Sequence, residues 1–203
     1  KDIKKLDEFL GEIFRYTKGK ISVKTRLGLT DPGEFKEIIE VYNKYEMEEL
    51  IIHPRVRTEF YRLSPHIDSF IYALEHSKNR LCYNGDIRSV KDYASILRSI
   101  SESPETYKLH AVMIGRAAVG DPSIFRQIKG GPPASRQELL NYLTTQELGL
   151  KEYMNEDRPV LFHMKEIWSY INMMNDPDPR LYKQILKSKT PGEYHAAVRR
   201  ILS

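Results

Sequence analysis

The chain has 203 residues, of which 40% are hydrophobic and 30% charged, with a formal net charge of +4. This composition is typical of a globular protein and excludes a disordered or collagen-like chain, while the modest positive charge permits a polyanionic partner without requiring one. Because there is one cysteine, Cys82, and no apolar run long enough to span a bilayer, we expect a cytoplasmic protein without internal disulfides, a multi-cysteine zinc site or a membrane partner.

Short apolar segments recur about every thirty residues, which is the size of a βα unit. We predict strands at Ile21–Lys24, Leu50–His53, Leu81–Asn84 and Ala111–Ile114. Helical patterns alternate with them, and an amphipathic helix with apolar residues from Ile3 to Ile13 precedes the first strand. Strands that alternate with helices predict a parallel sheet covered by helices.

Helix-start signals follow the predicted strands. Asp31-Pro32-Gly33-Glu34 has the order of an N-cap, an N1 proline and an N3 acid, and Ser89 is placed to cap a later helix. The second unit is less regular because Pro54 and Pro65 interrupt it. We interpret the region after His53 as a long active-site loop that leads to a helix over 67–76.

A complete (β/α)₈ barrel needs about 250 residues, and the βα pattern covers residues 1–129 only. Residues 130–134, which include Gly130-Gly131-Pro132-Pro133, form a predicted linker, and 135–203 a small all-α bundle. The predicted fold class is therefore α/β, half of a TIM barrel followed by a helical domain. We expect the other half-barrel to be missing from this chain or supplied by a second chain, because bare strand edges need cover.

Polar residues follow all four predicted strands, where barrel active sites form. They are Lys24 and Arg26, His53 and Arg55, Asn84-Gly85-Asp86, and Gly115-Arg116. Cations at three of the four ends indicate an anionic ligand, and the last turn is suited to a phosphate. Purely structural explanations stay open: a lysine paired inside the barrel, a satisfied histidine and a generic Asn-Gly turn. Cys82 is expected to act as a small hydrophobe, and the scattered histidines predict no metal site.

These segments together resemble the tRNA-dihydrouridine synthases. The similarity rests on Val23-Lys24-Thr25-Arg26-Leu27-Gly28, Ile52-His53-Pro54-Arg55, Tyr83-Asn84-Gly85-Asp86-Ile87 and Met113-Ile114-Gly115-Arg116-Ala117-Ala118 through Phe125, in this order. The resemblance implies strands five to eight of an FMN-binding barrel and a helical tRNA-binding domain, that is, the C-terminal half of an enzyme that reduces uridine in tRNA with NADPH.

The resemblance also implies roles for individual residues. Lys24 would contact the flavin ring. FMN contacts are further implied for His53, for Asn84, Gly85 and Asp86, and for Gly115 and Arg116, the last two groups at the phosphate. Arg26 and Arg55 would bind substrate. Phosphate contacts to tRNA are expected from cations of the helical domain: Lys151, Arg158, Lys165, Lys183, Lys187, Lys189, Arg199 and Arg200.

Two departures from the family pattern limit this prediction. Pro54 stands where the family usually has glycine or alanine, and the loop that carries the family's proton-donating cysteine is absent. No catalytic residue is therefore predicted in this chain, and we expect the chain alone to be inactive as a reductase. Two other functions stay open: an FMN-dependent barrel oxidoreductase for a small molecule, and a truncated, non-catalytic RNA-binding module. No DNA partner is expected.

Overall fold

The computed structural model describes residues 2–60, 62–175 and 177–202. Contacts divide the chain into two compact units: the first comprises residues up to Ile87 together with Lys91–Ile114, and the second comprises Arg88–Val90 and the chain from Gly115 onward. Among the residues that the structure describes, no helix is long and apolar enough to cross a membrane.

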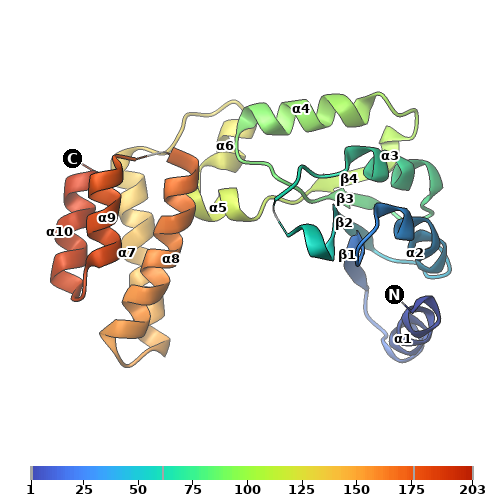
Figure 1. Ribbon diagram of the computed structural model, residues 1–203, viewed down its shortest axis with the longest axis horizontal. Coiled ribbons are helices and arrows are strands. Elements are labelled where there is room, and N and C mark those ends of the chain that lie inside the picture. Colours follow the sequence, from blue (N-terminus) through green and yellow to red (C-terminus); the bar gives the residue numbers. More distant parts are fainter. Residues whose placement is uncertain (1, 61, 176, 203) are drawn as a thin grey trace. The chain divides into compact units, whose positions relative to one another are not determined.

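The first unit is a parallel sheet with helices (Figure 1). Its strands have the order β1-β2-β3-β4 and all pair in parallel. The elements are α1 (Ile3–Tyr16), β1 (Ser22–Gly28), η1 (Pro32–Glu34), α2 (Phe35–Tyr42), β2 (Glu49–Val56), η2 (Arg57–Glu59), α3 (Ile67–His76), β3 (Leu81–Tyr83), α4 (Val90–Ser101), η3 (Thr106–Lys108) and β4 (Leu109–Val112). Four βα units in one sheet confirm the predicted α/β class and a partial barrel.

Apolar side chains on one sheet face pack against the helices. Leu50 and Ile52 of β2, Leu81 of β3, and Phe35 and Ile39 of α2 are buried in one core. Residues two apart on a strand share a face, so the residues between them point to the other side. The core therefore fixes which strand residues face away from the helices.

Local capping explains where the first-unit helices begin. The Asp31 carboxylate accepts a hydrogen bond from Gly33 N at 2.7 Å, and the Glu34 carboxylate accepts one from Asp31 N at 2.9 Å. The three backbone donors of this turn, with the Thr30 hydroxyl, hold the pKa of Glu34 down to about 2. The predicted N-terminal signal at 31–34 is thus confirmed, and it sets the exit direction of the chain after β1.

Strand ends differ from the prediction by a few residues. β1 continues to Gly28 and β2 to Val56, so His53-Pro54-Arg55 lies within a strand and the prediction that the loop starts after His53 is wrong. The register shifts between Arg26 and Gly28 of β1, which accommodates a proline that lacks a backbone donor. The helix over 67–76 is confirmed as α3.

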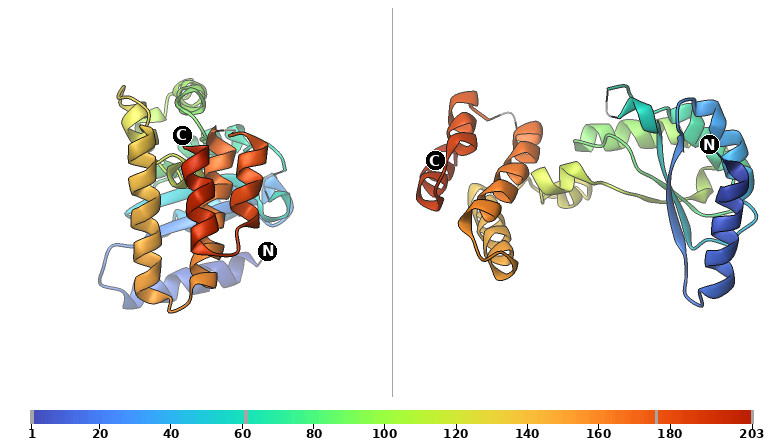
Figure 2. Two further views of the ribbon diagram at one scale, coloured as in Figure 1. Left: turned by 90° about the vertical axis from the view of Figure 1, so that its left-hand side faces the viewer. Right: turned by 60° about the horizontal axis from the view of Figure 1, so that its bottom comes forward.

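The second unit is all-helical. Figures 1 and 2 show the helices of its C-terminal part side by side as a bundle. Its elements are α5 (Arg116–Gly120), α6 (Ile124–Ile128), α7 (Arg136–Tyr153), α8 (Asp157–Asn175), α9 (Pro179–Lys187) and α10 (Pro191–Ile201). The predicted Ser135 cap is present, since its hydroxyl accepts a hydrogen bond from Glu138 N at 3.2 Å.

Buried aromatic and aliphatic side chains hold the bundle together. Trp168 of α8 is 1% exposed and donates its indole N–H to the Tyr194 hydroxyl of α10 at 3.0 Å. α5 packs so closely on α8 that a Cβ added at Gly120 would lie 2.4 Å from the Tyr170 carbonyl oxygen. This contact groups α5 and α6 with the bundle, so the compact units divide before Gly115, whereas a linker is predicted at 130–134.

Candidate functional site

The predicted site residues of β1 and β2 lie within these strands: Lys24 in the first half of β1, and Arg26, His53 and Arg55 nearer the carboxyl ends. Arg26 pairs with His53 in the register of the two parallel strands. Leu27 of β1 is buried in the core beneath the helices, so its neighbour Arg26, and Lys24 two residues earlier, belong to the opposite face. The structure therefore brings Lys24, Arg26 and His53 together on the face that the helices do not cover.

Positive charge dominates this part of the sheet. Burial, followed by the nearby charges of Arg26, Lys24 and Arg55, lowers the pKa of His53 to about 4, and Asp86 opposes the shift. Desolvation, reinforced by Arg26, also lowers the pKa of Lys24. The imidazole of His53 is thus neutral at physiological pH, and the surplus of cations is the electrostatic condition for an anionic ligand.

Arg55 is placed differently from the other cations. It is fully buried, forms an ion pair with Asp86 through Nη2, and donates from Nη1 to the Phe60 carbonyl at 3.3 Å. Close by, Glu59 accepts from Val56 N at 3.0 Å and contacts His66 Nε2 at 2.6 Å. The predicted substrate contact of Arg55 stays a prediction. Its burial favours a positioning role through Asp86.

The Asn84-Gly85-Asp86 turn follows β3 directly. The Asn84 side-chain amide donates to the Met113 carbonyl at 2.9 Å, which ties the turn to the segment after β4. Asp86 has a φ of 31°, a conformation that costs a residue with a Cβ free energy. Gly85 has little room, because an added Cβ would lie 2.9 Å from the Tyr83 hydroxyl. The buried Arg55 guanidinium thus holds a strained turn in place.

Gly115 and Arg116 belong to the second unit. Gly115 is the N-cap of α5, which has five residues, and a Cβ added to this glycine would meet open space within the described chain. Such a short helix contributes a small dipole, so any anion recognition here rests on the backbone N–H groups and the guanidinium of Arg116.

Cys82 lies inside β3 and is 2% exposed. Burial, together with Glu49, raises the pKa of its thiol to about 11, so the protein holds it as an unreactive thiol. Within residues 2–60, 62–175 and 177–202, no group of three or more His, Cys, Asp or Glu side chains is arranged to hold a metal ion.

The sequence identifies Arg55 and Asp86 as candidate site residues but does not predict their ion pair or the contact between Glu59 and His66. The Arg55–Asp86 ion pair and the Glu59–His66 contact join positions 31 and 7 residues apart. Spacing along a strand or helix gives no signal for such pairs. The one available signal was an arginine flanked by proline and valine in an apolar strand, since a buried guanidinium requires a partner.

Known proteins resemble this chain over most of its length. The model of the dihydrouridine synthase (Dus) family matches residues 1–198. A probable tRNA-dihydrouridine synthase from Helicobacter pylori strain J99 is 30% identical over 173 residues, which cover 84% of this chain and 50% of the relative. The tRNA-dihydrouridine(16) synthase of Cupriavidus necator is 25% identical over 184 residues, 89% of this chain and 51% of the relative. The chain thus spans about half the length of these two proteins.

Proposed function

Because this chain belongs to the dihydrouridine synthase family, we propose that it is the C-terminal half of a tRNA-dihydrouridine synthase. The whole enzyme would reduce the C5–C6 double bond of a uracil in tRNA, with FMN as cofactor and NADPH as electron donor. The observation that carries the proposal is the sheet face on which the cations Lys24 and Arg26 lie beside the neutral His53, together with the family match over nearly the whole chain.

The chemistry of the strand ends fits FMN. The cofactor is an anion through its single phosphate, and when bound it would supply the electrons that reach the uracil ring. Lys24 would lie against the ring, where a fixed cation stabilises negative charge at no reorganisation cost. His53, neutral at physiological pH, would contribute a hydrogen bond rather than a charge.

The turn after β3 would hold the cofactor through a supported backbone. Asn84 is anchored on Met113 and Asp86 on Arg55, so Gly85 presents its backbone from a fixed position. In the proposal Arg55 positions the turn, and Arg26 is the cation that binds the substrate. Arg26 donates to the Arg57 carbonyl at 3.4 Å, a weak bond that a substrate can replace.

Gly115 and Arg116 would bind the FMN phosphate. A glycine N-cap leaves the backbone donors of the following turn accessible, and a guanidinium matches phosphate geometry with two parallel hydrogen bonds. This assignment rests on the chemistry of that turn and on the family resemblance.

Proton donation must come from a part of the enzyme other than these residues. The thiol of Cys82 is buried in β3 and its pKa is raised to about 11, which leaves it unsuited as an acid near neutral pH. We therefore expect the 203-residue chain alone to be inactive and to require the other four βα units of a barrel.

The helical unit would contact tRNA. Exposed cations such as Lys183, Lys187 and Arg200 can neutralise backbone phosphates, the sequence-independent part of RNA binding. Acidic residues are interspersed with them, so a continuous basic face is not required by the proposal.

The experiment is NADPH oxidation by the complete synthase with unmodified tRNA as substrate. We expect oxidation that depends on tRNA and is slowed at least tenfold by Lys24→Met, with FMN affinity reduced in a fluorescence titration. Lys20→Met is the matched control, since Lys20 is an exposed lysine paired with Glu48 at 3.0 Å. NADPH oxidation that proceeds with a small-molecule acceptor but not with tRNA would contradict the proposal.

A further inference from the structure

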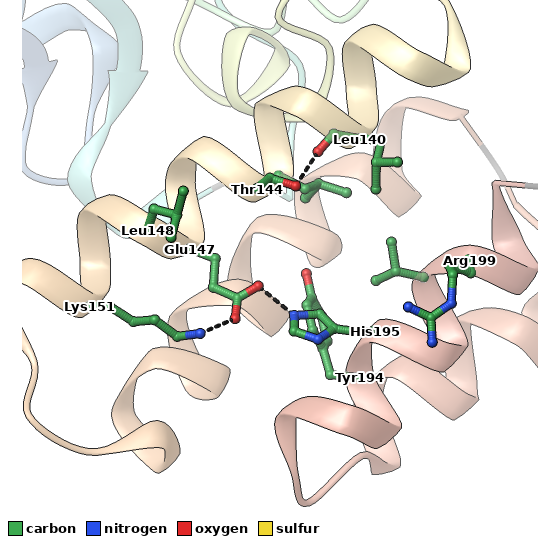
Figure 3. Close-up of a pocket in the computed structure, with 10 residues that line it drawn as sticks. Leu140, Thr144, Glu147, Leu148, Lys151, Tyr194, His195 and Arg199 are labelled. Atoms are coloured by element: carbon green, nitrogen blue, oxygen red, sulfur yellow. Dashed lines mark hydrogen bonds and ion pairs between the residues drawn. The ribbon is translucent and has the colours of Figure 1, made fainter.

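The second unit contains a pocket of about 350 Å³ between α7 and α10 (Figure 3). Its apolar wall includes Leu143, Leu148 and Val198. Leu148 is 58% exposed, a large apolar side chain at the solvent side of the pocket. The volume is in the range of sites for small organic ligands.

A buried carboxylate lies in this pocket. Glu147 is 7% exposed, accepts a hydrogen bond from Lys151 Nζ at 2.7 Å, and contacts His195 Nε2 at 2.7 Å through its other oxygen. Figure 3 shows Glu147 and His195 pointing toward one another. Burial raises the pKa of Glu147, but the hydrogen bonds from Lys151 and His195 outweigh it and the pKa is lowered. The carboxylate is therefore charged, and each oxygen keeps a second lone pair.

Cations outnumber anions around the pocket. Lys151 and Arg199 line it, with Glu147 as the one acid among the lining residues. Lys151 and His195 are engaged by Glu147, whereas Arg199 is exposed and makes no ion pair with the rest of the described chain. The pocket thus offers an acceptor for N–H groups, an apolar wall, and a guanidinium for an anion.

We propose that this pocket binds a nucleotide, with the base against the leucines, its N–H groups on Glu147, and its phosphate on Arg199. A fatty acid lacks the N–H donors, and an ammonium ligand would be repelled by the cations. Guanine suits the carboxylate best because its N1–H and N2–H₂ groups point the same way. The ligand is either a free mononucleotide or a guanosine of an RNA chain, and only the RNA source rests on the proposed function.

The competing explanation is that Glu147 and His195 only join α7 to α10. A structural pair of this kind requires no ligand and assigns no role to Arg199 or Leu148. Variants at these two exposed positions therefore separate binding from folding, whereas Glu147→Gln also weakens the link between the helices.

Isothermal titration of the complete synthase with GMP, AMP, CMP and UMP tests the proposal. We expect GMP to bind at least tenfold more tightly than UMP, and guanosine without phosphate to lose about tenfold. Arg199→Ala should lose about tenfold for GMP, and Leu148→Trp, which places an indole across the pocket, should abolish binding. Arg180→Ala is the control, because Arg180 is an exposed arginine of α9 that does not line this pocket.

Competition distinguishes the two sources of the nucleotide. If GMP displaces a bound tRNA transcript, the site receives a guanosine of RNA; if GMP binds without displacement, it receives a free nucleotide, and both results support the pocket. Absence of saturable GMP binding at millimolar concentration, or equal loss in Arg199→Ala and Arg180→Ala, would overturn it. Retention of tRNA reduction in the complete synthase would then leave the proposed function standing.

Discussion

His53 makes the stability of the protein depend on pH in a defined way. Its pKa is lowered from 6.5 to about 4 by burial and by Arg26, Lys24 and Arg55. The unfolded chain therefore binds a proton at His53 that the folded chain does not bind between these two values. The contribution of His53 to stability is fully present above the pKa of the histidine in the unfolded chain. It is lost as the pH falls toward the pKa in the folded chain.

The size of this effect follows from the shift. A change in pKa from 6.5 to about 4 lowers the free energy of unfolding by about 3 kcal/mol when the pH is below both values, since each pKa unit is about 1.4 kcal/mol. Between about pH 7 and about pH 5, proton linkage lowers the free energy of unfolding by about 2 kcal/mol. In urea this lowers the midpoint by about 1 M for a typical slope of about 2 kcal/mol/M.

Urea denaturation of the wild type and of His53→Gln at both pH values measures the effect. Glutamine keeps the polarity and size of the side chain but does not titrate, so the variant should lose about 2 kcal/mol less than the wild type. His110→Gln, at an exposed position of β4, is the control and should follow the wild type. Equal losses in wild type and His53→Gln, or an NMR titration of His53 near 6.5, would refute the reasoning.

Three further changes have expected outcomes. Asp86→Ala removes the carboxylate partner of the fully buried Arg55 and should lower the free energy of unfolding by about 3 kcal/mol. The double variant Arg55→Met/Asp86→Ala should recover part of this loss. A loss under about 1 kcal/mol in chemical denaturation would argue against a buried ion pair. Gly120→Ala places a Cβ against the Tyr170 carbonyl and should lower the free energy of unfolding by about 1–3 kcal/mol, measured by the fluorescence of Trp168. Gly149→Ala, in a helix with open space, should instead raise it by about 0.5–1 kcal/mol. The reverse order would show that α5 does not pack on α8 as described. Leu27→Ala removes a fully buried side chain and should lower stability by about 2–5 kcal/mol in thermal unfolding, a loss that an exposed leucine such as Leu186 should not reproduce.

Periodicity and capping were sufficient to predict the element order. Apolar runs such as Leu50–His53 and the signal at Asp31 are local, so they specify strands and helix starts without knowledge of distant residues. The predicted end of β2 was wrong by three residues because Pro54 was treated as a break. Three residues of β2 from Pro54 to Val56 stand against two of β1, so the extra residue lies in the segment that contains the proline, and the strand continues to Val56.

The candidate site was only partly accessible from the sequence. Placing Lys24, Arg26 and His53 on one face requires strand alternation and a parallel register, which the pattern supplies. The burial of Arg55 and its ion pair with Asp86 arise from tertiary packing. The pocket between α7 and α10 likewise joins Glu147 and His195, which lie 48 positions apart, and no local pattern connects them.

Nucleoside mass spectrometry of cellular tRNA tests the central proposal most directly. Deletion of the gene that encodes this chain should remove dihydrouridine from at least one tRNA position, and the wild-type gene should restore it. A gene carrying Lys24→Met should restore little, while Lys20→Met should restore it fully. Unchanged dihydrouridine at every tRNA position after deletion would contradict the assignment of this chain to a tRNA-dihydrouridine synthase activity.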